Sequence, residues 1–122
     1  MPRLHVIQIN VTDMDLAIDF YCTRLGFAIR SRDHYPELVK LEHDQIPLVL
    51  YRVKQLITPA QVDTSPYSLV LDMAVESLGQ EIEALRQRGV EVLQVAPQDS
   101  LAGMYASIRD PFGTTLHIVT SR

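Results

Sequence analysis

The sequence predicts an α+β fold in which two tandem βαβββ modules form an open, cupped mixed sheet. Strand and helix patterns follow one order along residues 1–53 and repeat that order along residues 67–122. Each predicted helix ends at a glycine, and superimposing Gly26 on Gly89 gives a repeat of 63 residues that covers essentially the whole chain. A chain of 122 residues suffices for one compact soluble domain, with residues 54–66 as the linker between its modules.

The first module is predicted to open with a strand and a helix. Residues 4–11 alternate apolar and polar side chains, which is the pattern of a strand with one covered face. Thr12 or Asp13 can cap the next segment, where apolar residues recur at helical spacing until Gly26. Turn-forming sequences then separate three further predicted strands, at residues 27–32, 37–42 and 47–53.

The second module is predicted to repeat this order after the proline-containing linker, although a chance alternation of strands and helices is the alternative. A strand over residues 67–75 precedes a helix over residues 76–88, which carries Leu78, Ile82 and Leu85 on its apolar side. Three strands complete the module, at residues 90–96, 104–109 and 114–120.

Charge and composition exclude several classes of partner. The net charge is −4, and 11 basic and 15 acidic residues are mixed along the chain, so no basic stripe exists for nucleic acid. No apolar segment has the length of a membrane span, and the N-terminus does not read as a signal peptide. We therefore expect a cytoplasmic protein in which the single cysteine, Cys22, is a reduced core residue.

Two local motifs carry a resemblance to a known superfamily. Residues 13–21, which end in Phe-Tyr, are followed by Leu-Gly-Phe at 25–27, and Asp-Pro-Phe-Gly at 110–113 leads into Leu-His-Ile at 116–118. Together, inside a duplicated βαβββ pattern, they resemble the vicinal oxygen chelate superfamily, the glyoxalase/bleomycin-resistance/dioxygenase group. The Asp-Pro-Phe-Gly turn is a fold marker, because Asp110 can accept hydrogen bonds from the backbone that follows it.

The resemblance implies four positions where metal-using members place their ligands on the concave face of the sheet. In this chain the first falls at Val6, which His5 misses by one residue, and another falls at Val70. Because successive side chains of a strand point to opposite faces, a one-residue offset directs His5 away from the cavity.

The two remaining positions fall at Leu48 or Val49 and at His117. Only His117 is a plausible ligand, and a single imidazole does not make a divalent metal site. The sequence therefore predicts no metal and no other cofactor. An atypical site in which His5 and His117 converge with Asp72 is the alternative, while His34 and His43 are expected in turns.

Strand alternation predicts which polar side chains share the concave face with His117. An apolar wall that carries a few convergent polar groups is typical of pockets for small organic molecules. Asp72, flanked by Leu71 and Met73, needs a partner such as Arg109, His117, an ordered water or a ligand cation. The predicted ligand-binding residues are Gln8, Asn10, Tyr51, Asp72, Tyr105, Ser107 and His117.

These features favour metal-independent binding of a small aromatic or cationic molecule, as the bleomycin-resistance branch does with antibiotics. That resemblance also implies a homodimer with two symmetric sites. Whether the protein is an enzyme stays open. The main alternative is a divalent-metal-dependent lyase or transferase of the glyoxalase/dioxygenase type, and a metal-free acid/base pair of His117 and Asp72 is another. A third reading is an interaction subunit whose cavity has collapsed.

Overall fold

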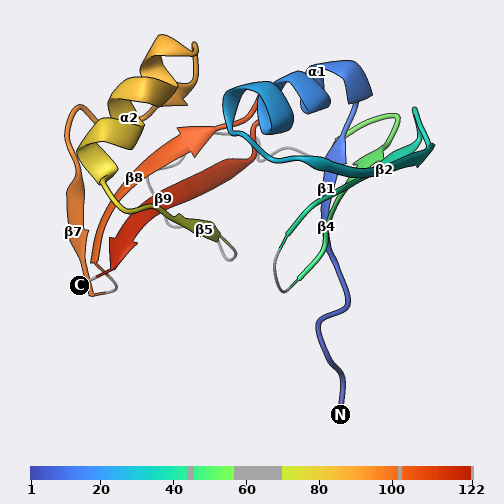
Figure 1. The fold of residues 1–122 in the computed structure, drawn as a ribbon, viewed down its shortest axis with the longest axis horizontal. Coiled ribbons are helices and arrows are strands. Elements are labelled where there is room, and N and C mark those ends of the chain that lie inside the picture. Colours follow the sequence, from blue (N-terminus) through green and yellow to red (C-terminus); the bar gives the residue numbers. More distant parts are fainter. Residues whose placement is uncertain (44–45, 57–69, 102, 122) are drawn as a thin grey trace. The chain divides into compact units, whose positions relative to one another are not determined.

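The computed structural model describes residues 1–43, 46–56, 70–101 and 103–121, and the chain forms two compact units, residues 1–57 and 58–122 (Figure 1). Each unit has its own helix and its own sheet of mixed strands. The predicted α+β class is confirmed. The boundary between the units lies within the predicted linker, most of which falls outside the described residues.

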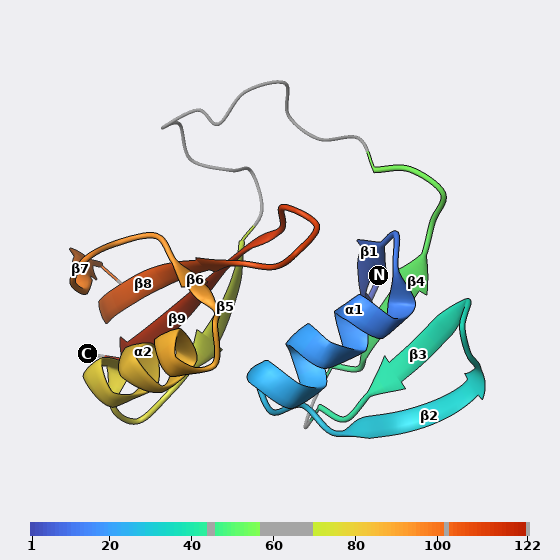
Figure 2. The same ribbon diagram turned by 90° about the horizontal axis from the view of Figure 1, so that it is seen from above.

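In the first unit, four strands form a sheet in the order β1-β4-β3-β2. The opening strand β1 runs parallel to β4, and the other neighbours are antiparallel. Helix α1 continues directly into the π-helix η1 and lies across one face of this sheet (Figure 2). The elements are β1 (Ile7–Val11), α1 (Met14–Ile18), η1 (Asp19–Arg24), β2 (Ile29–His34), β3 (Leu38–Leu41) and β4 (Leu48–Arg52).

The second unit repeats this topology with the order β5-β9-β8-β6. Again the opening strand runs parallel to the closing strand, here β5 beside β9, and the short strand β7 pairs with β8 as an addition. The elements are β5 (Leu71–Ala74), α2 (Leu78–Gln87), β6 (Glu91–Val92), β7 (Gln98–Ser100), β8 (Gly103–Arg109) and β9 (Thr115–Ser121). The predicted duplication is therefore present in the strand order.

Each core lies between the helix of a unit and one face of its sheet. In the first unit the residues of β1 and β4 that face the helix, such as Ile9 and Leu50, are buried beneath Met14 and Ala17. In the second unit the three helix residues predicted to be apolar contacts are all buried: Leu78, Ile82 and Leu85. The opposite face carries Gln8 and Asn10 in the first unit and Asp72 and His117 in the second.

The helices begin and end close to the predicted residues, but the helix in the first unit changes from an α-helix to a π-helix at Asp19. Asp13 caps it by accepting a hydrogen bond from the Leu16 N–H at 3.1 Å, and Gly26 ends it with φ of 95°. Between them, residues Asp19–Arg24 form a π-helix. Phe20 and Tyr21 are both buried there and meet edge to face at 5.0 Å, and the wider turn lets two consecutive rings reach the core.

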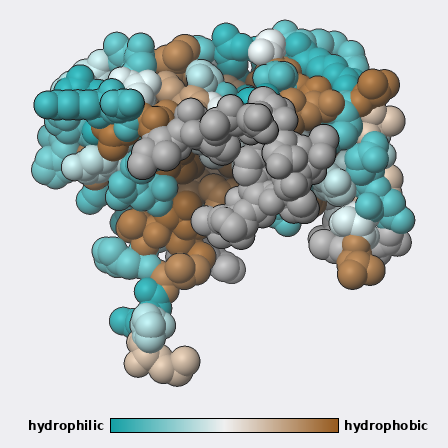
Figure 3. Space-filling view, turned by 180° about the vertical axis from the view of Figure 1, so that it is seen from behind, coloured by the Kyte–Doolittle hydropathy of each residue, from teal (hydrophilic) through white to brown (hydrophobic). Residues whose placement is uncertain are grey.

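Strand β1 begins at Ile7 instead of residue 4 because its partner β4 begins at Leu48, opposite Ile7. The residues before β1 extend from the first unit (Figure 1 and Figure 3). Leu4 in this extension keeps 76% of its surface exposed. His5 lies in this exposed extension. The strand expected at residues 67–75 is observed as β5, and its first three residues lie outside the described part of the chain.

The strand expected over residues 90–96 stops at Val92. Arg86 of α2 donates hydrogen bonds to the carbonyl oxygens of Gln94 and Val95, at 2.9 and 3.2 Å, so these carbonyls bond the helix instead of a neighbouring strand. The backbone then turns away and later supplies β7, which the sequence did not predict. No helix among the described residues is long and apolar enough to cross a membrane.

The Asp-Pro-Phe-Gly turn has the predicted internal hydrogen bonds. Asp110 is buried, and its Oδ1 accepts from the N–H groups of Phe112 at 2.9 Å and Thr114 at 2.8 Å. Gly113 adopts φ of 89°, a left-handed conformation that favours glycine. The turn fixes the register between β8 and β9.

Candidate functional site

Three strands of the second unit align polar side chains in one row. Strand register places Asp72 of β5 opposite His117 of β9, and His117 opposite Ser107 of β8. Tyr105 lies two residues before Ser107 and therefore shares its face. The alternate residues Ala106 and those that flank His117 are buried on the helix side. We call Asp72, Tyr105, Ser107 and His117 the His117 face.

The imidazole of His117 is held from two sides. Its Nδ1 lies 3.4 Å from Oδ1 of Asp72, and the Tyr105 ring stacks on it with centroids 4.7 Å apart and planes inclined by 23°. The His117 side chain is 27% exposed and that of Asp72 is 49% exposed. Both groups are therefore accessible to a solute. The predicted need of Asp72 for a partner is met by His117, although the carboxylate is less buried than the sequence suggested.

Gln94 holds Ser107 in this row through two hydrogen bonds, and the sequence did not single it out. Its Oε1 accepts from the backbone N–H of Ser107 at 2.7 Å, and its Nε2 donates to the Ser107 hydroxyl at 3.1 Å. The side chain thus occupies the place that a strand partner would take after β6 ends at Val92. Gln94 lies in a segment predicted as strand, so no sequence signal separated it from its neighbours.

The first unit carries its three predicted residues on the sheet face opposite α1. Gln8 Nε2 donates to Asn10 Oδ1 at 2.8 Å, and strand pairing sets Tyr51 opposite Asn10 and Val49 opposite Gln8. Gln8, Asn10 and Tyr51 are exposed. They form an amide pair beside a phenol, available for contacts with a ligand.

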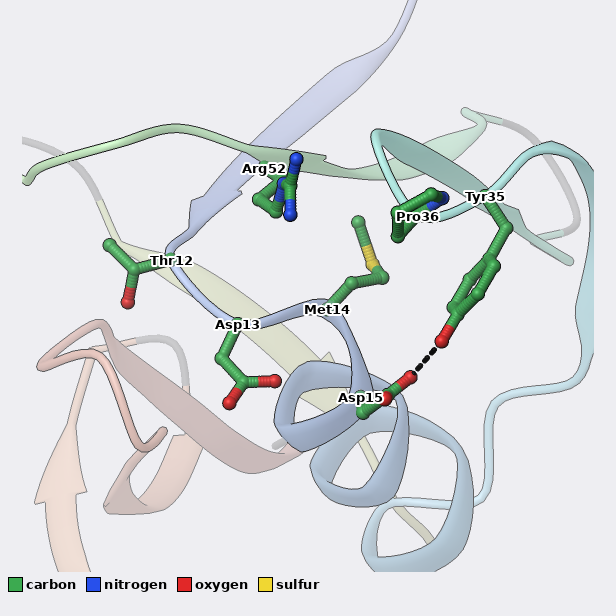
Figure 4. Close-up of a pocket in the computed structure, with 7 residues that line it drawn as sticks. All are labelled: Thr12, Asp13, Met14, Asp15, Tyr35, Pro36 and Arg52. Atoms are coloured by element: carbon green, nitrogen blue, oxygen red, sulfur yellow. Dashed lines mark hydrogen bonds between the residues drawn. The ribbon is translucent and has the colours of Figure 1, made fainter.

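A hollow of about 280 Å³ lies elsewhere in the first unit, beside the start of α1 (Figure 4). Tyr35 donates a hydrogen bond to Asp15 across it, and this bond raises the pKa of the Tyr35 phenol. Asp13 caps the helix, and Arg52 pairs with Glu37. Because its charged groups already have partners and it contains none of the seven predicted residues, we assign it no ligand.

Comparison with protein families identifies the chain. The model of the Glyoxalase/Bleomycin resistance protein/Dioxygenase superfamily matches residues 3–118. The chain belongs to this superfamily. A search of curated proteins found no significant match to the sequence.

Solved structures support the superfamily fold. A glyoxalase family protein from Enterococcus faecalis is 22% identical, with 98% of each chain covered and a TM-score of 0.76. A glyoxalase/bleomycin resistance protein/dioxygenase from Nocardioides is 20% identical over 99% of this chain and 84% of that chain, with a TM-score of 0.74. TnmS3, an antibiotic binding protein from Streptomyces sp. CB03234, is 22% identical over 100% and 99% of the chains, with a TM-score of 0.71.

Of the four positions at which the superfamily resemblance implies metal ligands, three carry aliphatic side chains and the fourth is His117. Val49 shares the Gln8 face of its sheet, whereas Leu48 points into the core beneath α1. Val6 and Val70 immediately precede β1 and β5 and are partly exposed. Within the described residues of either unit, no three His, Cys, Asp or Glu side chains come together as a metal-binding group. His117 and Asp72 alone supply two ligands, fewer than the three that zinc usually takes from protein.

Proposed function

We propose that this chain binds a small, flat organic molecule on the His117 face without a metal, in the manner of the bleomycin-resistance branch. The observation that carries the proposal is the partly exposed imidazole stacked on Tyr105 and paired with Asp72. A stacked pair of rings offers an aromatic guest a further ring to pack against. A partly exposed carboxylate beside those rings favours a guest that also carries positive charge.

All seven predicted residues remain proposed ligand contacts, each within its own unit. Asp72, Tyr105, Ser107 and His117 form the His117 face of the second unit, and Gln8, Asn10 and Tyr51 form the amide pair and phenol of the first unit. An antibiotic binding protein among the structural neighbours supports an antibiotic-like guest, and the mild net charge of −4 is compatible with a cation. We also propose a homodimer with two symmetric sites. A cytoplasmic location agrees with a single unpaired thiol, Cys22.

The experiment uses two flat probes of similar size and opposite charge. 9-Aminoacridine, a cation, is titrated against the protein by fluorescence, and 9-anthracenecarboxylate, an anion, serves as the matched ligand. We expect the cation to bind at least tenfold more tightly. Asp72→Asn should weaken it roughly fivefold to thirtyfold, which corresponds to about 1–2 kcal/mol for one charged contact. Asp33→Asn, which alters an exposed hairpin carboxylate, is the control and should leave affinity unchanged.

Metal analysis of protein purified without chelator tests the competing function. We expect a metal content far below one ion per chain. Stoichiometric zinc, iron, nickel or manganese that is lost in the His117→Ala variant would instead establish the metal-dependent glyoxalase/dioxygenase-type function. Equal affinity for the two probes, or no effect of Asp72→Asn, would contradict the proposed binding mode.

A further inference from the structure

The imidazole of His117 has one nitrogen engaged and the other available. Nδ1 lies 3.4 Å from the Asp72 carboxylate, and no hydrogen bond from a described residue reaches Nε2. Because an ionised carboxylate accepts hydrogen bonds and does not donate them, its position beside Nδ1 favours the tautomer of a neutral imidazole that carries the proton on Nδ1. The lone pair of a neutral imidazole then lies on Nε2.

We propose that His117 is a general base and that Asp72 is its positioning residue, so that this face catalyses proton abstraction without a metal. The inference rests on the proposed function, since it assigns chemistry to the same flat guest. The substrate class is a planar ring compound with an acidic C–H bond at its edge. Packing against Tyr105 beside the imidazole places such a ring near the imidazole plane, where the Nε2 lone pair lies, and the edge proton is then transferred to Nε2.

The transfer conserves atoms and electrons. The C–H bond breaks, the proton goes to Nε2 and the electron pair stays on the ligand. Asp72 stabilises the imidazolium that forms, as a carboxylate behind a histidine does in hydrolytic triads. Water then takes the proton from Nε2, which regenerates the neutral base, and no oxidant or reductant is consumed.

This arrangement distinguishes His117 from the other histidines. His5, His34 and His43 are exposed, and among the described residues His117 alone lies within ion-pair distance of a carboxylate and stacks on an aromatic ring. A general base needs a fixed orientation and an open nitrogen. His117 has both.

The experiment uses 5-nitrobenzisoxazole, a flat neutral carbon acid. Removal of its ring C–H proton forms a carbon–nitrogen triple bond and breaks the nitrogen–oxygen bond, so the product is a coloured cyanonitrophenolate, and the proton leaves on the base. We expect turnover above the buffer rate, a loss of about a hundredfold in kcat/KM for His117→Ala, and partial recovery when free imidazole is added. His34→Ala, at an exposed hairpin residue, should stay within twofold of the unsubstituted protein.

The positioning role of Asp72 predicts a different kinetic signature. Asp72→Asn should lower kcat about tenfold or more with little change in KM, and Asp72→Glu should recover part of the loss. Tyr105→Leu, which removes the stacking ring, should chiefly raise KM. Urea midpoints measured for every variant separate these effects from loss of folding.

Each outcome decides the inference. Turnover that falls in His117→Ala and returns with imidazole supports it. Turnover equal to buffer, or equal in His117→Ala and His34→Ala, overturns it. If 9-aminoacridine still binds in that case, the proposed function survives and only the base chemistry fails; if neither binding nor turnover is seen, both fail.

Discussion

Replacing Gln94 tests whether one side chain substitutes for a missing strand partner. Gln94→Met keeps the length of the side chain and removes both of its hydrogen bonds to Ser107. Each bond contributes about 0.5–1.5 kcal/mol, and a buried N–H left without a partner adds about 1–3 kcal/mol. Because Ser107 is buried, these contributions together predict a fall of roughly 2–6 kcal/mol in the free energy of unfolding.

Urea denaturation followed by far-UV circular dichroism measures this change, and amide hydrogen exchange locates it. The Ser107 N–H should exchange much faster in Gln94→Met, while the amides of β9 keep their protection. Gln94→Glu is the matched variant, since a carboxylate can accept from both the N–H and the hydroxyl of Ser107. It should recover much of the lost stability. A Gln94→Met protein within about 0.5 kcal/mol of the original, with unchanged Ser107 exchange, would contradict this role of Gln94.

Three further outcomes follow from the described contacts. Asp110→Ala should lower the free energy of unfolding by about 2–4 kcal/mol in urea denaturation, because two backbone N–H groups lose a charged acceptor. Gly26→Ala should cost about 1–2 kcal/mol by the same assay: space exists for a methyl group, but φ of 95° disfavours it. Burial raises the pKa of the Cys22 thiol, so iodoacetamide should label it slowly at pH 7.5 and faster as pH rises; rapid labelling at neutral pH contradicts this.

Sequence patterning predicted the parts of the fold that local chemistry determines. Asp13 and Gly26 bracket the first helix because a capping carboxylate and a left-handed glycine act on adjacent backbone. Asp110 organises its turn for the same reason. Strand alternation also placed Asp72 and His117 on one face correctly, since their phase depends only on position within each strand.

Features set by distant contacts were not predictable. The π-helix depends on the burial of both Phe20 and Tyr21, which only the packed core decides. The early end of β6 depends on Arg86 bonding carbonyls of a later segment. The 3.4 Å approach of Asp72 to His117 needs the register between β5 and β9, which neither strand specifies alone.

Parallel pairing of β5 with β9 joins the opening and closing strands of the second unit. Asp72 and His117 therefore lie at the two ends of a segment that contains α2, β6, β7 and β8, so their contact closes a long loop. A guest that contacts both side chains links the two ends of that loop and stabilises the folded unit. Its binding should suppress opening of the whole unit, so that slower global hydrogen exchange reports occupancy even where no local amide touches the guest.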